Sequence, residues 1–156
     1  MREFLKKHIL TRPGLIRSTG GKAVGEHEGL SFYTIGERHG LGIGGGIPYY
    51  VAEKDFATNT LTVAEGPYDE KLFSRELIAA DINWISGNPP AGGPKLALRC
   101  EARIRYRQPL QRCFVKRQTS NVKCRVVFDN PQRAVTPGQS IVFYGGEEML
   151  GGGIIV

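Results

Sequence analysis

The sequence lacks the features of a membrane-bound or secreted protein. No stretch approaches the roughly 18 consecutive apolar residues that a helix needs to cross a bilayer. Residues 1–8 are rich in charge and have no apolar core of the kind found in a signal peptide. Because 40% of the residues are hydrophobic and 23% charged, the composition is that of a globular protein. These absences predict a cytoplasmic protein without a membrane partner.

Cysteine is scarce, and the usual signatures of an enzyme are missing. The three cysteines, Cys100, Cys113 and Cys124, are odd in number and show no C-x-x-C spacing, which argues against a disulfide framework or a zinc site. We expect them to be small core or near-surface residues, with a reactive thiol beside an arginine as the alternative. The chain also has no triphosphate-binding loop and no nucleophile elbow. His27 and His39 have no second ligand at metal-binding spacing. We therefore predict no catalytic residue, no metal and no cofactor in this chain.

A glycine-rich segment, residues 40–45, matches the G-x-G-x-x-G pattern of dinucleotide-binding proteins. That pattern needs a strand before it and a helix after it, whereas here a predicted helix precedes it and a predicted strand follows. The segment is instead interpreted as a flexible loop, or as a loop whose bare backbone approaches another surface closely.

Few long elements are possible, because 21 glycines and nine prolines interrupt the chain. The apolar runs between them are rich in Val, Ile, Phe and Tyr, which predicts a mainly β protein. We expect a small β-rich domain over residues 1–67 and an antiparallel β-barrel over residues 68–156, divided at Gly66-Pro67. The first domain is predicted to contain short helices at 4–10 and 28–40, and hairpins over 15–25 and 49–64. The barrel strands are predicted at 96–107, 112–117, 122–128, 140–144 and 149–155.

Acidic residues are nearly absent from residues 95–125, where ten of the 21 Lys and Arg residues lie with only Glu101. This segment carries about +9, against +6 for the whole chain. Within it, charged residues occupy odd positions from 99 to 107, and Cys100, Ala102, Ile104 and Tyr106 occupy even ones, the period of a half-buried strand. Three arginines then share one face with no acidic neighbour, at roughly the spacing of backbone phosphates. Nucleic-acid binding and a solvated edge strand both remain open interpretations.

Several motifs occur in an order that resembles one family, the tRNA-specific 2-thiouridylases, over residues 4–155. They are Glu26-His27-Glu28-Gly29-Leu30, Tyr33-Thr34-Ile35-Gly36-Glu37-Arg38, Gly40-Leu41-Gly42-Ile43-Gly44-Gly45, Tyr50-Val51, Lys54-Asp55, Asn59-Thr60-Leu61, Asn83-Trp84, Arg105-Tyr106-Arg107-Gln108, Val135-Thr136-Pro137-Gly138-Gln139 and Leu150-Gly151-Gly152-Gly153-Ile154-Ile155. Most members of the family have Gln where Glu37 stands, and we assign that side chain no role.

The resemblance implies a tRNA-modifying function that this chain performs only in part. In the family, an N-terminal domain uses ATP to adenylate the wobble uridine, position 34, of certain tRNAs, and a cysteine persulfide then supplies sulfur to C2. That domain's S-G-G-x-D-S loop and catalytic cysteines are absent from this sequence. The chain resembles the central β-rich domain and the C-terminal barrel, which is akin to the second domain of elongation-factor GTPases. We therefore expect it to dock tRNA and to be inactive alone, with a persulfide sulfur-donor protein serving the complete enzyme and no DNA partner.

Residues that contact tRNA in the family correspond here to Arg105, Tyr106 and Gln139, and the charge pattern adds Arg103 and Arg107. Strict alternation would turn Tyr106 into the core, unless the strand ends or bulges before Gln108-Pro109. Gln139 follows a Pro-Gly pair typical of a type II turn. It either presents its amide to RNA or braces that turn.

Two other functions remain open. The chain could be an enzyme acting through one of its own cysteines, or a protein-interaction barrel that uses its basic face on an acidic partner.

Overall fold

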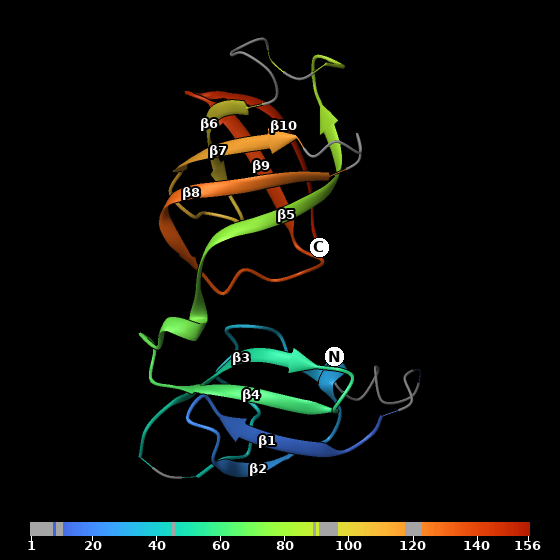
Figure 1. Cartoon of the computed structure of the whole chain (residues 1–156), viewed down its shortest axis with the longest axis vertical. Helices are drawn as coiled ribbons and strands as arrows, with labels where there is room; N and C mark the ends of the chain where they lie inside the picture. Colours follow the sequence, from blue (N-terminus) through green and yellow to red (C-terminus); the bar gives the residue numbers. More distant parts are fainter. Residues whose placement is uncertain (1–7, 9–10, 45, 89, 91–96, 118–122) are drawn as a thin grey trace. The chain divides into compact units, whose positions relative to one another are not determined.

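The structure is a computed structural model that describes residues 8, 11–44, 46–88, 90, 97–117 and 123–156, with the backbone alone for residue 117. The chain forms two compact units, Met1–Phe73 and Ser74–Val156 (Figure 1). Each unit buries a hydrophobic core of its own, as an independent domain requires.

The first unit is built on a four-stranded mixed sheet with strand order β2-β1-β4-β3. Strands β1 and β2 form an antiparallel hairpin, and so do β3 and β4, as the sequence predicts. Strands β1 and β4 pair in parallel. Asn59 has a φ of 53°, the left-handed conformation expected of it in the turn of the second hairpin. The strands are β1 (Gly14–Ser18), β2 (Ala23–His27), β3 (Tyr49–Asp55) and β4 (Thr60–Glu65).

The α-helix predicted over residues 28–40 is wrong. A single 3-10 turn, η1 (Leu30–Phe32), forms there. Gly36 and Gly40 have φ of 85° and 77°, outside helical geometry, and the Gly36 N–H donates to the Val51 carbonyl at 2.7 Å. The apolar residues Leu30, Phe32 and Tyr33 of this segment are part of the hydrophobic core of the first unit, although no α-helix forms around them. The other predicted helix, over residues 4–10, lies outside the described residues apart from His8.

The second unit is a closed barrel with strand order β10-β5-β8-β7-β6-β9, which confirms the predicted fold class (Figure 1). A 3-10 turn, η2 (Glu70–Leu72), precedes the first barrel strand, and the Asp69 carboxylate caps it by accepting from the Lys71 N–H at 2.9 Å. The strands are β5 (Phe73–Trp84), β6 (Ala97–Arg103), β7 (Gln111–Arg117), β8 (Lys123–Arg133), β9 (Ser140–Gly145) and β10 (Glu148–Ile155).

Glycines in β10 allow the strands on either side to approach closely. A Cβ on Gly151 would lie 2.3 Å from the Asn83 carbonyl oxygen in β5, and one on Gly152 would lie 2.7 Å from the Ile141 carbonyl oxygen in β9. Because both of these oxygens are backbone atoms, they could not move aside for a Cβ as a flexible side chain could. The triple glycine of the sequence is therefore a packing requirement of barrel closure.

Candidate nucleic-acid interface

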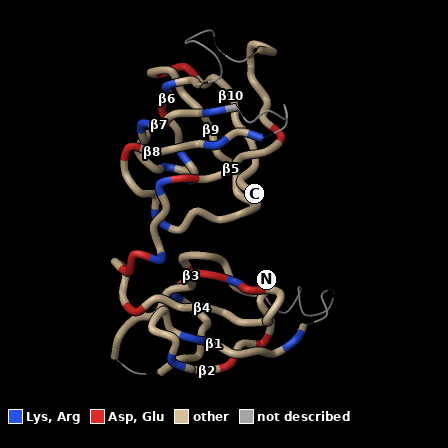
Figure 2. The backbone as a smooth tube through the Cα atoms, viewed as in Figure 1, with Lys and Arg blue, Asp and Glu red and all other residues tan. Residues whose placement is uncertain are grey.

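The net charge of the chain lies entirely in the barrel unit. Ser74–Val156 contains twelve Lys and Arg and six Asp and Glu, a net +6, whereas Met1–Phe73 contains nine of each. Lys and Arg recur along β6, β7 and β8 (Figure 2). A basic unit of this kind attracts polyanions over a distance of about a Debye length, roughly 10 Å at 0.1 M salt.

The alternation predicted for β6 is confirmed up to Ile104. Cys100, Ala102 and Ile104 are buried, and Arg103 between them is half-buried. The strand ends at Arg103, whereas the sequence predicted it to continue to residue 107. Beyond that point the alternation no longer dictates where side chains lie.

Tyr106 lies outside the barrel, with 87% of its surface exposed. The chain turns after β6, because the Gln108 N–H donates to the Arg105 carbonyl at 3.2 Å and Arg107 adopts a φ of 63°. The interpretation of Tyr106 as a core aromatic is therefore wrong, and the early strand end is the reason. The Arg107 guanidinium lies 5.2 Å from the centre of the Tyr106 ring, within cation–π range.

Three glutamine side chains attach this turn to the neighbouring strands. Gln108 accepts from the Ile104 N–H at 2.9 Å and donates to the Gln132 amide oxygen at 2.7 Å. Gln132 is only 3% exposed, and its amide nitrogen donates to the Asn130 carbonyl at 2.8 Å and to the Gln111 amide oxygen at 3.4 Å. A satisfied buried amide network of this kind rigidifies the segment that carries Arg105 and Tyr106.

Arg105 is held in a fixed orientation by the backbone just after β8. Its Nη2 donates to the Ala134 carbonyl at 2.7 Å, where Ala134 adopts a φ of 52°. Burial of part of the guanidinium, and secondarily the charge of Arg133, lower its pKa. The side chain nevertheless remains a cation at neutral pH, with an exposed surface.

Gln139 follows a type II turn, as predicted. The Gln139 N–H donates to the Thr136 carbonyl at 3.2 Å, and Gly138 between them has a φ of 87°, which favours glycine. The Gln139 carbonyl in turn accepts from the Ile155 N–H at 2.8 Å. These backbone bonds brace the turn. The side-chain amide oxygen is buried and has no hydrogen-bond partner among the described residues.

A groove of about 620 Å³ brings most of these residues together. Four of the five predicted site residues line it, and Arg107 is the exception. Sequence reasoning missed Ser140, Val142 and Tyr144, since only the pairing of β9 with β6 brings them beside the predicted residues. The lining consists of Arg103, Ile104, Arg105, Tyr106, Gly138, Gln139, Ser140, Val142 and Tyr144.

Arg103 lies across the groove's aromatic wall. Its guanidinium carbon is 5.0 Å from the centre of the Tyr144 ring, a cation–π contact that holds the planar group against the ring. Its Nε is buried and, among the described residues, has no hydrogen-bond acceptor. The groove therefore combines cations, two tyrosines, and a buried donor and acceptor that are both unpaired.

Not every arginine of the predicted row is free of acidic neighbours. Arg99 lies over the Phe114 ring at 5.0 Å, and its Nη2 is 3.7 Å from an Asp129 carboxylate oxygen of β8. Arg125 forms an ion pair with Glu76 of β5, with its Nε 2.8 Å from Oε2. The expectation of an unneutralised row is wrong for Arg99, because strand pairing brings in acids from outside the basic segment.

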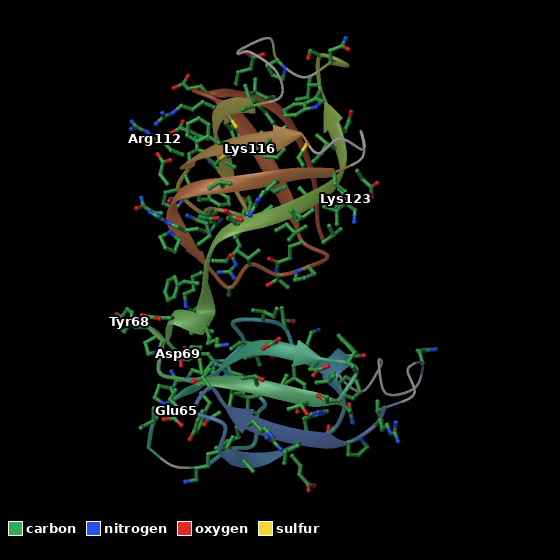
Figure 3. All side chains as sticks on the ribbon, viewed as in Figure 1. Glu65, Tyr68, Asp69, Arg112, Lys116 and Lys123 are labelled. Atoms are coloured by element: carbon green, nitrogen blue, oxygen red, sulfur yellow. The ribbon has the colours of Figure 1, made fainter. Side chains whose placement is uncertain are left out.

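Three further cations lie on the outer face of β7 and β8 (Figure 3). They are Arg112, Lys116 and Lys123, and none of their side chains has a hydrogen bond or ion pair within the part of the chain that the structure describes. None of them lines the groove. The basic segment is thus divided between a groove and an outer sheet face.

The cysteines lie in the barrel core, as expected. Cys100 and Cys113 are opposite each other on β6 and β7, with their sulfur atoms 3.7 Å apart. The hydrogen bond between the two thiols lowers the pKa of Cys100, and the same bond together with burial raises the pKa of Cys113. All three thiols are buried.

The described residues hold no group of three His, Cys, Asp or Glu side chains that could bind a metal ion. His27 is buried, and its Nε2 lies 3.1 Å from the Asn59 carbonyl oxygen, so it serves the packing of the first unit. No helix in the described part of the chain is long and apolar enough to cross a membrane.

The glycine-rich loop lines a second hollow, of about 360 Å³, with Arg38 and His39. Gly42 and Gly46 have φ of 66° and 52°, a left-handed conformation that favours glycine at these two positions. Both interpretations of the loop, flexibility and close approach of another surface, stay predictions.

In a comparison with known proteins, each of the two units matches a family model. The model of the aminomethyltransferase beta-barrel domain matches residues 74–155, and that of the tRNA methyl transferase PRC-barrel domain matches residues 2–65. Curated relatives are named tRNA-specific 2-thiouridylase MnmA. The relative from Marinobacter nauticus is 49% identical over 98% of this chain and 39% of its own length. Those from Burkholderia pseudomallei and Alkalilimnicola ehrlichii are 48% identical over 99% of this chain and 41% and 42% of their own lengths.

The sequence thus spans about two-fifths of the length of the curated relatives that it matches. Two adjacent domain models and near-complete coverage of this chain agree with the two compact units of the structure. The chain belongs to the tRNA-specific 2-thiouridylase family.

Proposed function

We propose that this chain is the tRNA-binding portion of a tRNA 2-thiouridylase, which installs sulfur at C2 of the wobble uridine, position 34. The observation that carries the proposal is the groove, which unites Arg103, Arg105, Tyr106 and Gln139 on a barrel with a net charge of +6. Cations pair with backbone phosphates, and an exposed tyrosine stacks on an unpaired base, which is how proteins recognise single-stranded RNA.

The roles divide by chemistry. Arg105, which Ala134 holds in place, pairs with a phosphate, while Tyr106 stacks on a base or bonds a ribose. Arg107 supports the Tyr106 ring. Gln139 presents its amide to the RNA, and Arg103 extends the positive wall. A prebuilt arrangement of this kind binds with little loss of conformational entropy.

The chemical step belongs, in this proposal, to a domain outside the sequence considered. That domain uses ATP, and a persulfide sulfur-donor protein supplies the sulfur, in the cytoplasm. We assign no step to Cys100, Cys113 or Cys124, because all three thiols are buried in the barrel. We propose that the chain has two domains, residues 1–67 and 68–156, and we expect neither DNA nor a membrane as partner.

A second candidate is a protein-interaction barrel that binds an acidic partner. The observation in its favour is the outer set of cations, Arg112, Lys116 and Lys123, which lies outside the groove (Figure 3). An acidic protein surface would fit these side chains as well as a phosphate backbone does.

The test is an electrophoretic mobility shift of unmodified tRNA by the purified chain at low salt. We expect a shifted complex that dissociates as the salt concentration rises, because binding through phosphates releases counterions. Unchanged mobility at low salt contradicts the proposal. A cellular complex that persists after nuclease treatment supports the protein-interaction candidate instead.

A further inference from the structure

The groove differs from a simple phosphate site in what lines it. Alongside Arg103 and Arg105 it is lined by two tyrosines, Tyr106 and Tyr144, by Val142 and by the buried Ile104. A surface that only follows a nucleic-acid backbone has cations but no use for a partly apolar hollow. At about 620 Å³, the groove is within the size range of pockets that enclose small organic groups, about 300–1,000 Å³.

Two buried polar atoms of the groove residues, one a hydrogen-bond donor and the other an acceptor, have no partner among the described residues. Arg103 Nε is a donor without an acceptor, and Gln139 Oε1 is an acceptor without a donor, among the described residues. Leaving such atoms unpaired away from water is unfavourable, so a ligand that pairs with both gains affinity. Both atoms are shielded from solvent in the free chain, so pairing with a ligand requires their side chains to turn, while the Gln139 backbone stays bonded to Thr136 and Ile155.

The pair of atoms distinguishes a nucleobase from a phosphate group. A phosphate group offers acceptors only, which suits Arg103 Nε but cannot satisfy Gln139 Oε1. The edge of a nucleobase offers a donor and an acceptor side by side, and in single-stranded RNA that edge is free. A base also fits the aromatic and aliphatic lining that a phosphate leaves unused.

We infer that the groove accepts one unstacked nucleobase of the RNA, whose edge Arg103 and Gln139 bind by hydrogen bonds while Tyr144 holds the Arg103 guanidinium in place. This inference rests on the proposed function and names the part of the RNA that the groove takes. Tyr144 acts through Arg103, at 5.0 Å from its ring, and is a positioning residue.

The test compares short RNAs that carry equal charge. Fluorescein-labelled tetraribonucleotides of uridine, cytidine or adenosine, and a tetramer of abasic ribose phosphates, are titrated with the full chain at low salt, with anisotropy as the readout. We expect at least one base-containing tetramer to bind about tenfold more tightly than the abasic one, the range expected for one base held in a protein site. In Gln139→Ala and Arg103→Lys this ratio falls toward one.

The matched control is Arg112→Ala, which removes a cation of the outer face and none of the groove lining. It weakens all the tetramers alike and leaves the ratio unchanged. A thermal melt of each variant identifies any loss of folding, and Arg103→Lys preserves the charge.

The outcomes separate the inference from the proposed function. Equal binding of abasic and base-containing tetramers overturns the base site, while tRNA docking stands. A ratio that survives in both groove variants also overturns it, as does binding of tRNA without binding of any tetramer. If neither the tetramers nor tRNA bind, both the base site and the proposed function are overturned.

Discussion

Single residues decide what the barrel presents to RNA, and Tyr106 is the clearest example. The period-2 pattern of the sequence points this side chain inward, but the structure exposes 87% of it because β6 ends at Arg103. The signal for the exposed position was local: Gln108-Pro109 interrupts the run just downstream. For Gln139 the Pro-Gly pair sufficed, since the turn type follows from those two residues.

At this scale we predict that Tyr106→Ala weakens tRNA binding by about 1–3 kcal/mol, the range for base–aromatic stacking. Tyr106→Phe keeps the ring and should bind almost as the parent does. Because the side chain is exposed, the free energy of unfolding of both variants should lie within about 0.5 kcal/mol of that of the parent. The measurement is a filter-binding titration with tRNA, together with chemical denaturation. Parent-like binding of Tyr106→Ala would remove the ring from the interface.

At the scale of elements, the sequence predicts the strands well and their partners poorly. Turn residues and alternation indicate β1 to β4 and β6 to β10, since these signals are local. Closure of the barrel through β5 and β10 depends on pairing across some 70 residues, which no local pattern reports. The hydrogen bond between the side-chain amides of Gln108 and Gln132 cannot be predicted either, because a sequence does not distinguish these glutamines from exposed loop glutamines. The domain boundary after residue 67 stays a prediction.

The close approach of β10 to β5 predicts that Gly151→Ala is strongly destabilising. Its new Cβ would lie 2.3 Å from the Asn83 carbonyl oxygen, a backbone atom that moves only with the strand. We expect a loss of about 1–3 kcal/mol in the free energy of unfolding, as for other overpacked positions. Chemical denaturation measures it. The control is Gly145→Ala, which meets only the flexible Leu150 side chain at 3.4 Å; equal stabilities of the two variants would contradict the account.

The turn between β3 and β4 predicts an acid-sensitive first unit. The Asp55 carboxylate accepts from the Thr58 hydroxyl at 2.7 Å and from the N–H groups of Thr58 and Ala57 at 3.2 and 2.9 Å. The Thr58 bonds lower the pKa of Asp55 below its ordinary value. A lowered pKa means that the carboxylate stabilises the fold above the unfolded pKa, about 3.9, and that this stabilisation is lost as pH falls through the folded value.

We therefore expect Asp55→Asn to reduce the difference in unfolding free energy between neutral pH and about pH 3. The measurement is denaturation at both pH values. Glu53→Gln is the matched control, because Glu53 lies on the same strand and its side chain has no hydrogen bond among the described residues. If Asp55→Asn keeps the full pH dependence of the parent, the carboxylate does not contribute as described.

At the scale of the whole molecule, the two units have similar secondary structure but different net charge. The first unit is neutral overall and the barrel carries +6, although both are β-sheet units of similar length. Composition predicted the excess of charge, but not how folding divides it. Asp129 and Glu76 neutralise Arg99 and Arg125 on the outer face, so the groove keeps Arg103 and Arg105 for a ligand. Because Arg112, Lys116 and Lys123 on the outer face also stay unpaired among the described residues, we expect the groove to bind RNA first and these three cations to contribute less.

The central claim, that the groove docks tRNA, is tested most directly by the dissociation constant of the chain for tRNA measured from about 50 to 200 mM salt. We predict that Arg105→Ala weakens binding by about 1–3 kcal/mol and reduces the salt slope by about one. Arg112→Ala, an arginine of the outer face, should change the dissociation constant less. An Arg105→Ala variant that binds as the parent does at every salt concentration, or a larger effect of Arg112→Ala, would contradict the claim.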